Sequence, residues 1–284
     1  MDGVIIINKQ KGFTSHDVVN VIRKKLNIKK VGHTGTLDPN ATGVLPILVG
    51  KATKISKYLI EHNKTYIATI KLGEKTDTGD SEGQVIETKK VPKKLEKEEI
   101  EQVLTDFLGK QKQLPPIYSA IKVKGKKLYE YAREGQEVKI EPRDIEIYKI
   151  KLLEYKYNKI KIEVECSKGT YIRTLCEDIS KKLETVGYME ELQRTKINEF
   201  KIENSLLLDD INIQNVEQKL IKIEEIFKEK NSIELNDKKL ELFLNGVKLT
   251  YDLPNDIYKI YNNNKCFVGI GIIENKLLKR DIVI

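Results

Sequence analysis

The 284-residue sequence has few of the residues on which disulfide, zinc or membrane structures depend. It contains three cysteines, without a CxxC pair, and three histidines, without an HxxxH or HxH arrangement. A disulfide framework and a zinc site are therefore not expected, and the cysteines are predicted to be buried free thiols. No apolar run approaches the roughly 18 residues of a membrane-spanning helix, and the apolar segment at residues 3–7 is too short for a secretory signal. A soluble, cytoplasmic protein without membrane contact is expected.

Several catalytic motifs are also missing. The segment nearest to a phosphate-binding loop is GVLPILVGKAT, residues 43–53, but six residues instead of four separate its glycines and Ala52 follows Lys51. There is no Gly-x-Ser-x-Gly turn and no signature of a zinc-dependent base deaminase. The sequence thus contains no recognisable site for a metal-activated water or a redox cofactor, and neither is predicted.

The positive charge lies mainly at the N-terminal end. Of the net charge of +8, residues 1–64 carry +7, from 11 Lys and Arg against 4 Asp and Glu, whereas residues 65–204 carry +2 and residues 205–284 carry −1. Such a field would attract a polyanion, most naturally a nucleic acid. A lysine-rich solvated surface would give the same charge, so the charge alone does not decide between them.

The hydrophobic pattern predicts an α+β fold. Strands are indicated at residues 4–8, 44–49, 64–72, 144–155 and 159–166, and helices at residues 16–26, after an N-cap at Thr14-Ser15, 51–60, 95–108 and 170–183. Because these elements lack regular βαβ alternation, we expect a central mixed, largely antiparallel sheet flanked by helices. From about residue 229, short strand signals separated by asparagine and glycine predict a small all-β module that packs on the main domain.

One loop stands out by its composition. The stretch HTGTLDPNATGVLP, residues 33–46, contains a single carboxylate, Asp38, between Leu37 and Pro39. Proline and the flanking glycines exclude regular helix or strand and restrict the backbone around the aspartate. Taken alone, an Asp-Pro pair is most simply a turn.

The loop and six further motifs resemble the TruB family of transfer-RNA pseudouridine synthases. The matching stretches follow one another over about the first two hundred residues: NKxxGxTS at 8–15, GHTGTLDPNATGVLP at 32–46, KTY at 64–66, LGEKTDTGDSEG at 72–83, PPIYSA at 115–120, KGTYIRTL at 168–175 and ELQRT at 191–195. The resemblance implies a pseudouridine synthase fold, with a catalytic domain at residues 1–228. It also implies that residues 229–284 form a PUA-like RNA-binding or packing domain.

The resemblance further implies an activity. It is the isomerisation of uridine 55 in the TΨC loop of transfer RNA, in which the N1–C1′ bond breaks and C5 bonds to C1′. This reaction uses no cofactor, and we expect a monomer that binds the T arm and loop and requires no protein partner. Two alternatives stay open: a synthase that is guided by RNA or acts on another RNA, and an RNA-binding or folding factor in which catalysis is secondary.

The resemblance also assigns residues to this reaction. Asp38 matches the catalytic aspartate, and Arg173 matches the arginine that pairs with it and favours its ionised form. Tyr66 matches the tyrosine that stacks on the target base, with its hydroxyl near C5. We expect Asp38 to be an isolated carboxylate, without a second one beside it.

The remaining assignments concern the RNA. Tyr171 and Leu192 match residues that line the uracil pocket, and His33 matches a histidine placed against the flipped nucleotides. Lys9 and Lys64 are expected to meet phosphates of the T arm.

Overall fold

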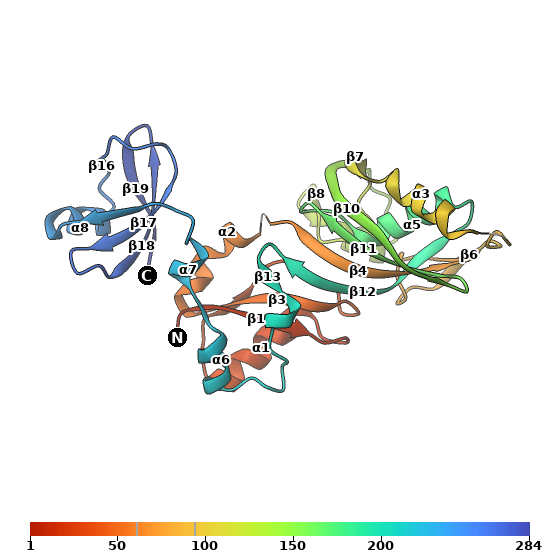
Figure 1. Cartoon of the computed structure of the whole chain (residues 1–284), viewed down its shortest axis with the longest axis horizontal. Helices are drawn as coiled ribbons and strands as arrows, with labels where there is room; N and C mark the ends of the chain where they lie inside the picture. The colour runs from red at the N-terminus through yellow and green to blue at the C-terminus, as the bar shows by residue number, and fades with distance from the viewer. Residues whose placement is uncertain (61, 94) are drawn as a thin grey trace.

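The computed structural model describes residues 1–60, 62–93 and 95–284 (Figure 1). Its main feature is a sheet with the strand order β14-β1-β3-β12-β4-β11-β10-β7, to which β2 and β13 are added at β3 and β12. These strands are β1 (Gly3–Lys9), β2 (Val31–His33), β3 (Thr42–Val49), β4 (Lys64–Leu72), β7 (Gly109–Gln113), β10 (Arg143–Lys156), β11 (Lys159–Cys166), β12 (Gly187–Ile197), β13 (Phe200–Lys201) and β14 (Ile221–Lys222). The predicted mixed, largely antiparallel sheet is confirmed, because among the described pairs of this sheet only β12 and β3 run parallel.

The parallel contact between β12 and β3 joins the two halves of the sheet. Gln193 pairs with Thr42 and Arg194 with Gly43. A β-carbon on Gly43 would lie 2.1 Å from the carbonyl oxygen of Arg194, and the Gly43 φ is +101°, so only glycine allows this approach. The loop between β2 and β3, which contains Asp38, is thereby fixed at the centre of the sheet.

Helices cover the two halves separately. Helix α1 (Ser15–Leu26) begins with a capping box in which Thr14 and Asp17 bind each other's backbone, and its apolar face packs on β1 and β3. Helices α3 (Lys97–Thr105) and α5 (Ile172–Lys182) pack against β4, β10 and β11. The predicted helix at 51–60 is instead a 3₁₀ turn, η1 (Gly50–Ile55), followed by α2 (Ser56–Leu59), and Gly109 opens β7 rather than closing a helix that extends to residue 108.

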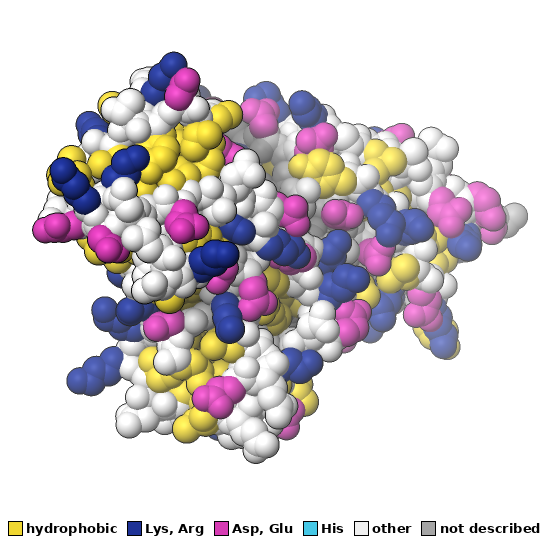
Figure 2. Space-filling model, turned by 60° about the vertical axis from the view of Figure 1, so that its left-hand side comes forward, with side chains coloured by type: hydrophobic (Ala, Val, Ile, Leu, Met, Phe, Trp, Pro, Cys, Tyr) yellow, Lys and Arg dark blue, Asp and Glu magenta, His cyan; other side chains and the backbone are white. Residues whose placement is uncertain are grey.

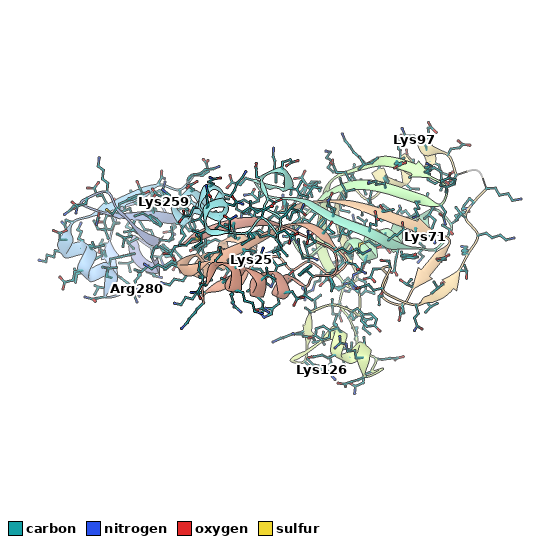
Figure 3. All side chains as sticks on the ribbon, turned by 90° about the horizontal axis from the view of Figure 1, so that it is seen from below. Lys25, Lys71, Lys97, Lys126, Lys259 and Arg280 are labelled. Carbon is teal, nitrogen blue, oxygen red and sulfur yellow. The ribbon has the colours of Figure 1, made fainter. Side chains whose placement is uncertain are left out.

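Two smaller units project from the sheet. Strands β5 (Glu74–Thr76) and β6 (Val85–Thr88) form a hairpin, and residues 77–84 are the loop between them. Strands β8 (Lys122–Val123) and β9 (Lys126–Lys127) with α4 (Leu128–Arg133) form a basic extension that stands away from the body of the molecule around Lys126 (Figure 3).

The C-terminal residues form a second sheet in the order β15-β17-β18-β19-β16. The strands are β15 (Ser232–Leu235), β16 (Leu249–Thr250), β17 (Ile257–Asn262), β18 (Phe267–Glu274) and β19 (Leu277–Val283). The predicted module is therefore strand-rich, but it also contains helix α8 (Asp237–Leu244), which an all-β module would lack. The helix forms because Asn236 caps it by accepting from Lys239 N, and its Phe243 packs in the core of the module.

The module packs on the main sheet, as predicted. Ile270 and Ile282 join a core cluster with residues of β1 and β3, and the Tyr58 hydroxyl of α2 donates to Asp281 at 2.5 Å. Short elements line the connection: η2 (Ile202–Asn204), α6 (Ile213–Lys219) and α7 (Ile223–Ile226). Because the core is shared, the boundary between residues 228 and 229 stays a prediction. Figure 2 shows the molecule with the C-terminal module toward the viewer. On this face, basic and acidic side chains are interspersed around hydrophobic patches.

Two further expectations from the sequence concern the state of the cysteines and the lack of a membrane-spanning helix. All three thiols are free, and Cys166 and Cys176 are buried as predicted, but Cys266 is exposed because it lies beside the turn between β17 and β18. Within the described ranges, no helix is both long and apolar enough to cross a membrane.

Candidate active site

The loop that contains Asp38 is held by its backbone. Leu37 N donates to the Ser15 hydroxyl at 2.9 Å, and the Pro39 carbonyl accepts from Gly12 N at 2.9 Å and from the Lys9 ammonium at 3.0 Å. The Asp38 side chain itself is 44% exposed. The main chain is thus fixed on both sides of a carboxylate that remains accessible, which is the arrangement that preorganised catalysis requires.

Arg173 lies beside this carboxylate. Its Nη2 is 3.3 Å from Asp38 Oδ2, and its side chain, in the first turn of α5, is only 10% exposed. The guanidinium also donates to the carbonyls of Tyr118 at 3.0 Å and Thr78 at 3.2 Å. These contacts orient the arginine independently of Asp38.

A second carboxylate contacts the same arginine. Asp80 Oδ2 lies 3.4 Å from Arg173 Nη1, and both side chains are 10% exposed. The Asp80 carboxylate also accepts from the Thr78 hydroxyl at 2.6 Å and from Glu82 N at 3.1 Å. The expectation that Asp38 has no other carboxylate near its site is therefore wrong, because the β5–β6 hairpin folds back onto α5.

A cavity of about 340 Å³ opens over the Asp38–Arg173 pair. This is within the range of about 300–1,000 Å³ for small-molecule sites. Five of the residues predicted from the sequence line it: Asp38, Tyr66, Tyr171, Arg173 and Leu192. Thr36, Leu37, Tyr118, Ser119, Ala120, Tyr129, Thr170, Ile172 and Met189 complete the lining. A carboxylate, a guanidinium and several aromatic rings therefore face one space that can receive a planar base.

Each tyrosine is placed by its neighbours. Tyr66, on β4, is 8% exposed, and burial raises the pKa of its hydroxyl. Tyr171 precedes α5, where the Gln113 side chain brackets its backbone by accepting from Tyr171 N at 2.7 Å and donating to Tyr171 O at 3.0 Å. The amide of Gln113 therefore fixes the entry to the helix that carries Arg173.

His33 and Lys64 do not line the cavity. His33 is the last residue of β2, its Nδ1 is buried and has no hydrogen-bond partner among the described residues, and burial lowers its pKa. Lys64 opens β4, and its ammonium donates to the His62 carbonyl at 2.6 Å. Their predicted contacts with RNA stay predictions.

The assignment of Lys9 to a phosphate of the RNA needs correction. Its side chain is fully buried, and the ammonium donates to the carbonyls of Phe13 at 2.7 Å, Pro39 at 3.0 Å and Gln10 at 3.1 Å. Burial lowers the pKa of Lys9 to about 8. The cation is engaged inside the protein, where it ties β1 to the loop of Asp38.

Known proteins are similar to this chain over nearly its whole length. A family model described as TruB family pseudouridylate synthase, N-terminal domain, matches residues 23–172, and one described as tRNA pseudouridylate synthase B C-terminal domain matches residues 173–234. This chain belongs to the TruB family. Proteins named tRNA pseudouridine synthase B are 45% identical over 282 residues in Caldanaerobacter subterraneus and 46% identical over 277 residues in Clostridium tetani. The first alignment covers 98% of each chain and the second covers 95% of each chain.

Solved structures confirm the fold. The crystal structure of a Cbf5-Nop10-Gar1 complex contains a chain with a TM-score of 0.72 and 26% identity, and the match covers 99% of the present chain and 83% of that one. A chain from an H/ACA RNP bound to a substrate RNA containing 2′-deoxyuridine gives a TM-score of 0.70 at 24% identity, with 99% and 84% covered. The α+β class predicted from the hydrophobic pattern and the pseudouridine synthase fold predicted from the motifs are thus confirmed.

Sequence reasoning missed three side chains that shape this TruB-family site. Asp80 lies in the matching stretch LGEKTDTGDSEG, from which no residue was assigned a role, and Gln113 lies just before PPIYSA. Arg194 belongs to ELQRT and is only 1% exposed. The sequence did offer a signal, because all three are charged or amide residues that lie in or next to matching motifs. Such residues are rarely buried without partners, so their positions mark them as candidates for polar contacts within the site.

The donor atoms near the site do not form a metal centre. Among the described residues, there is no group of three or more His, Cys, Asp or Glu side chains with the spacing to hold an ion. Asp38 and Asp80 are instead connected through the guanidinium of Arg173. The polar groups that line the cavity include the Asp38 carboxylate, the Arg173 guanidinium and tyrosine side chains.

Proposed function

We propose that this chain is a tRNA pseudouridine synthase that isomerises uridine 55 in the TΨC loop of transfer RNA. The observation that carries the proposal is the accessible carboxylate of Asp38, 3.3 Å from the buried guanidinium of Arg173, in a cavity lined by Tyr66, Tyr171 and Leu192. The proteins named tRNA pseudouridine synthase B, at 42–46% identity over most of both chains, support transfer RNA as the substrate.

Asp38 would be the catalytic group. Breaking the N1–C1′ bond builds positive character on the sugar, and a carboxylate beside it can stabilise that charge, attack carbon or move a proton. The Arg173 guanidinium, 3.3 Å from the Asp38 carboxylate, pairs with it and holds it at the mouth of the cavity. Overall one C–N bond is replaced by one C–C bond and a hydrogen passes from C5 to N1, so the reaction needs neither an oxidant nor water.

The other residues would bind the base and its strand. Tyr66 supplies a ring for stacking and a hydroxyl for proton transfer at C5, while Tyr171 and Leu192 close the pocket. The uridine must leave the stacked T loop, which costs a few kcal/mol, and aromatic surface in the pocket offsets this cost. His33 would lie against the flipped nucleotides and Lys64 near a phosphate. The chain would act as a monomer, without a protein partner, in the cytoplasm where transfer RNA is used.

A guided or ribosomal RNA substrate is the second candidate. It is favoured by the solved structures with this fold, whose matching chains belong to a Cbf5-Nop10-Gar1 complex and an H/ACA RNP. These chains are only 24–26% identical to this one, whereas the proteins named for transfer RNA are 45–46% identical. The larger similarity favours transfer RNA.

The test is incubation of the protein with an unmodified T-arm hairpin, without guide RNA, partner protein or added metal. Pseudouridine should appear at position 55 alone, and Asp38→Asn should give none. Absence of product with the wild type would refute the proposal. Product only when a guide RNA is added would support the second candidate, and tight hairpin binding without product would identify an RNA-folding factor.

A further inference from the structure

Arg194 is a buried cation that the mechanism above does not use. It lies on β12, between β3 and β4 (Figure 1), and its side chain is 1% exposed. No carboxylate forms an ion pair with it within the described residues. A buried charge is costly unless its hydrogen bonds are satisfied, so the partners that it does have indicate its role.

Those partners are the two ends of the Asp38 loop. Arg194 Nη2 donates to the Gly35 carbonyl at 2.7 Å and Nη1 to the Thr36 carbonyl at 3.5 Å, just before Asp38. Nε donates to the Val44 carbonyl at 2.8 Å, where the loop has re-entered β3. One planar guanidinium therefore spans the entry and the exit of the loop, and its fork geometry holds them at a fixed separation.

The same side chain reaches Tyr66. Arg194 and Tyr66 are directly opposite each other in the antiparallel pair of β12 and β4, so their side chains are neighbours on one face of the sheet. Burial raises the pKa of Tyr66, and the positive charge of Arg194 opposes that rise.

We propose that Arg194 is a positioning residue that fixes the Asp38 loop and the Tyr66 hydroxyl relative to each other, so that both act on one uracil. It touches neither the cavity nor the base and works through these two side chains. The inference rests on the proposed synthase function, in which Asp38 and Tyr66 act on the same nucleotide. It identifies what aligns two groups of which one lies in the β2–β3 loop and the other on β4.

Arg194→Lys tests the proposal, because it keeps a buried cation beside Tyr66 but cannot span the three carbonyls. Rate and binding are measured separately, by single-turnover formation of pseudouridine in the T-arm hairpin and by hairpin affinity, at a temperature where thermal melting shows the variant to be folded. The matched control is Arg23→Lys. Arg23 also donates to a backbone carbonyl, of Val31 at 2.9 Å, but from α1 and away from the cavity.

A displacement of about 1 Å between reacting groups can cost about 100-fold in rate. We therefore expect Arg194→Lys to lower the single-turnover rate about 100-fold while its hairpin affinity stays within about threefold of wild type. For the control Arg23→Lys, both the rate and the affinity should stay within about threefold of wild type.

The proposal is overturned if the rate of folded Arg194→Lys stays within threefold of wild type, or if affinity falls as much as the rate. If Arg194→Lys does not fold, Arg194→Gln is used in its place. Failure of both to fold would show that the arginine serves the fold and refute the proposal. The wild type is measured in parallel, and its failure to form pseudouridine would instead refute the function itself.

Discussion

Replacing Asp80 by asparagine tests how Arg173 is held. The Asp80 carboxylate lies 3.4 Å from Arg173 Nη1, with both side chains 10% exposed. At an effective dielectric constant of about 20, two unit charges at that distance attract by about 5 kcal/mol, which is an upper limit for the loss. Breaking a buried pair typically costs about 3–5 kcal/mol.

The actual cost should be smaller. Asparagine keeps an oxygen of the same shape for Thr78 and Glu82, and Arg173 keeps Asp38 and two carbonyls as partners. We therefore expect Asp80→Asn to lower the free energy of unfolding by about 2 kcal/mol. The guanidinium should move toward Asp38, and the single-turnover rate on the T-arm hairpin should fall about 100-fold.

The measurements are urea unfolding and quenched-flow detection of pseudouridine, with Asp77→Asn as the control. Asp77 lies in the same hairpin and accepts from Gln84 N at 2.8 Å, but no arginine among the described residues pairs with it. Its replacement should change the rate less than threefold. If Asp80→Asn keeps the wild-type rate while Arg173→Ala loses it, the second carboxylate does not hold the arginine and the reasoning is refuted.

Three further outcomes are expected. Asp38→Asn should abolish turnover but leave hairpin affinity within a few fold, because it removes a charge and little contact area; a collapse of binding would make Asp38 structural. Lys9→Met should leave the slope of log affinity against log salt unchanged, whereas Lys64→Ala should reduce it by about 0.7–0.9 if Lys64 meets a phosphate. For His33, the pKa is lower in the folded state, so the unfolded chain takes up the proton more readily and stability falls as pH drops below about 6.5. His33→Gln should weaken that fall in urea unfolding at several pH values, and an identical pH profile would count against the assignment.

Local patterns predicted much of the fold. The strand predicted at residues 64–72 has the bounds of β4, because its alternating apolar residues have one buried face. Helix α1 followed from its cap and its apolar spacing. Helix α8 was missed because its eight residues lie among strand signals, and its type is settled by an asparagine cap and by packing in the module core.

The sequence predicted which residues belong to the candidate site better than it predicted the contacts that these residues make. Matching motifs identified Asp38, Tyr66 and Arg173, which the structure places around one cavity. That Asp80 reaches Arg173, or that Lys9 is buried, depends on chain segments far apart in sequence meeting in space. The family motif and the positive charge of Lys9 assigned it to the RNA, whereas three backbone carbonyls around its ammonium accept from it.

The parallel contact between β3 and β12 has a consequence for how the protein is synthesised. The carbonyls around Asp38 are supported by an arginine that follows the Val44 carbonyl by 150 residues, and the strand that adjoins Gly43 is the same late segment. A ribosome releases the aspartate loop long before its support exists, and contacts between distant segments form slowly. A nascent or truncated chain that ends before β12 would thus contain the aspartate without an assembled site, and activity would begin only with the nearly finished protein.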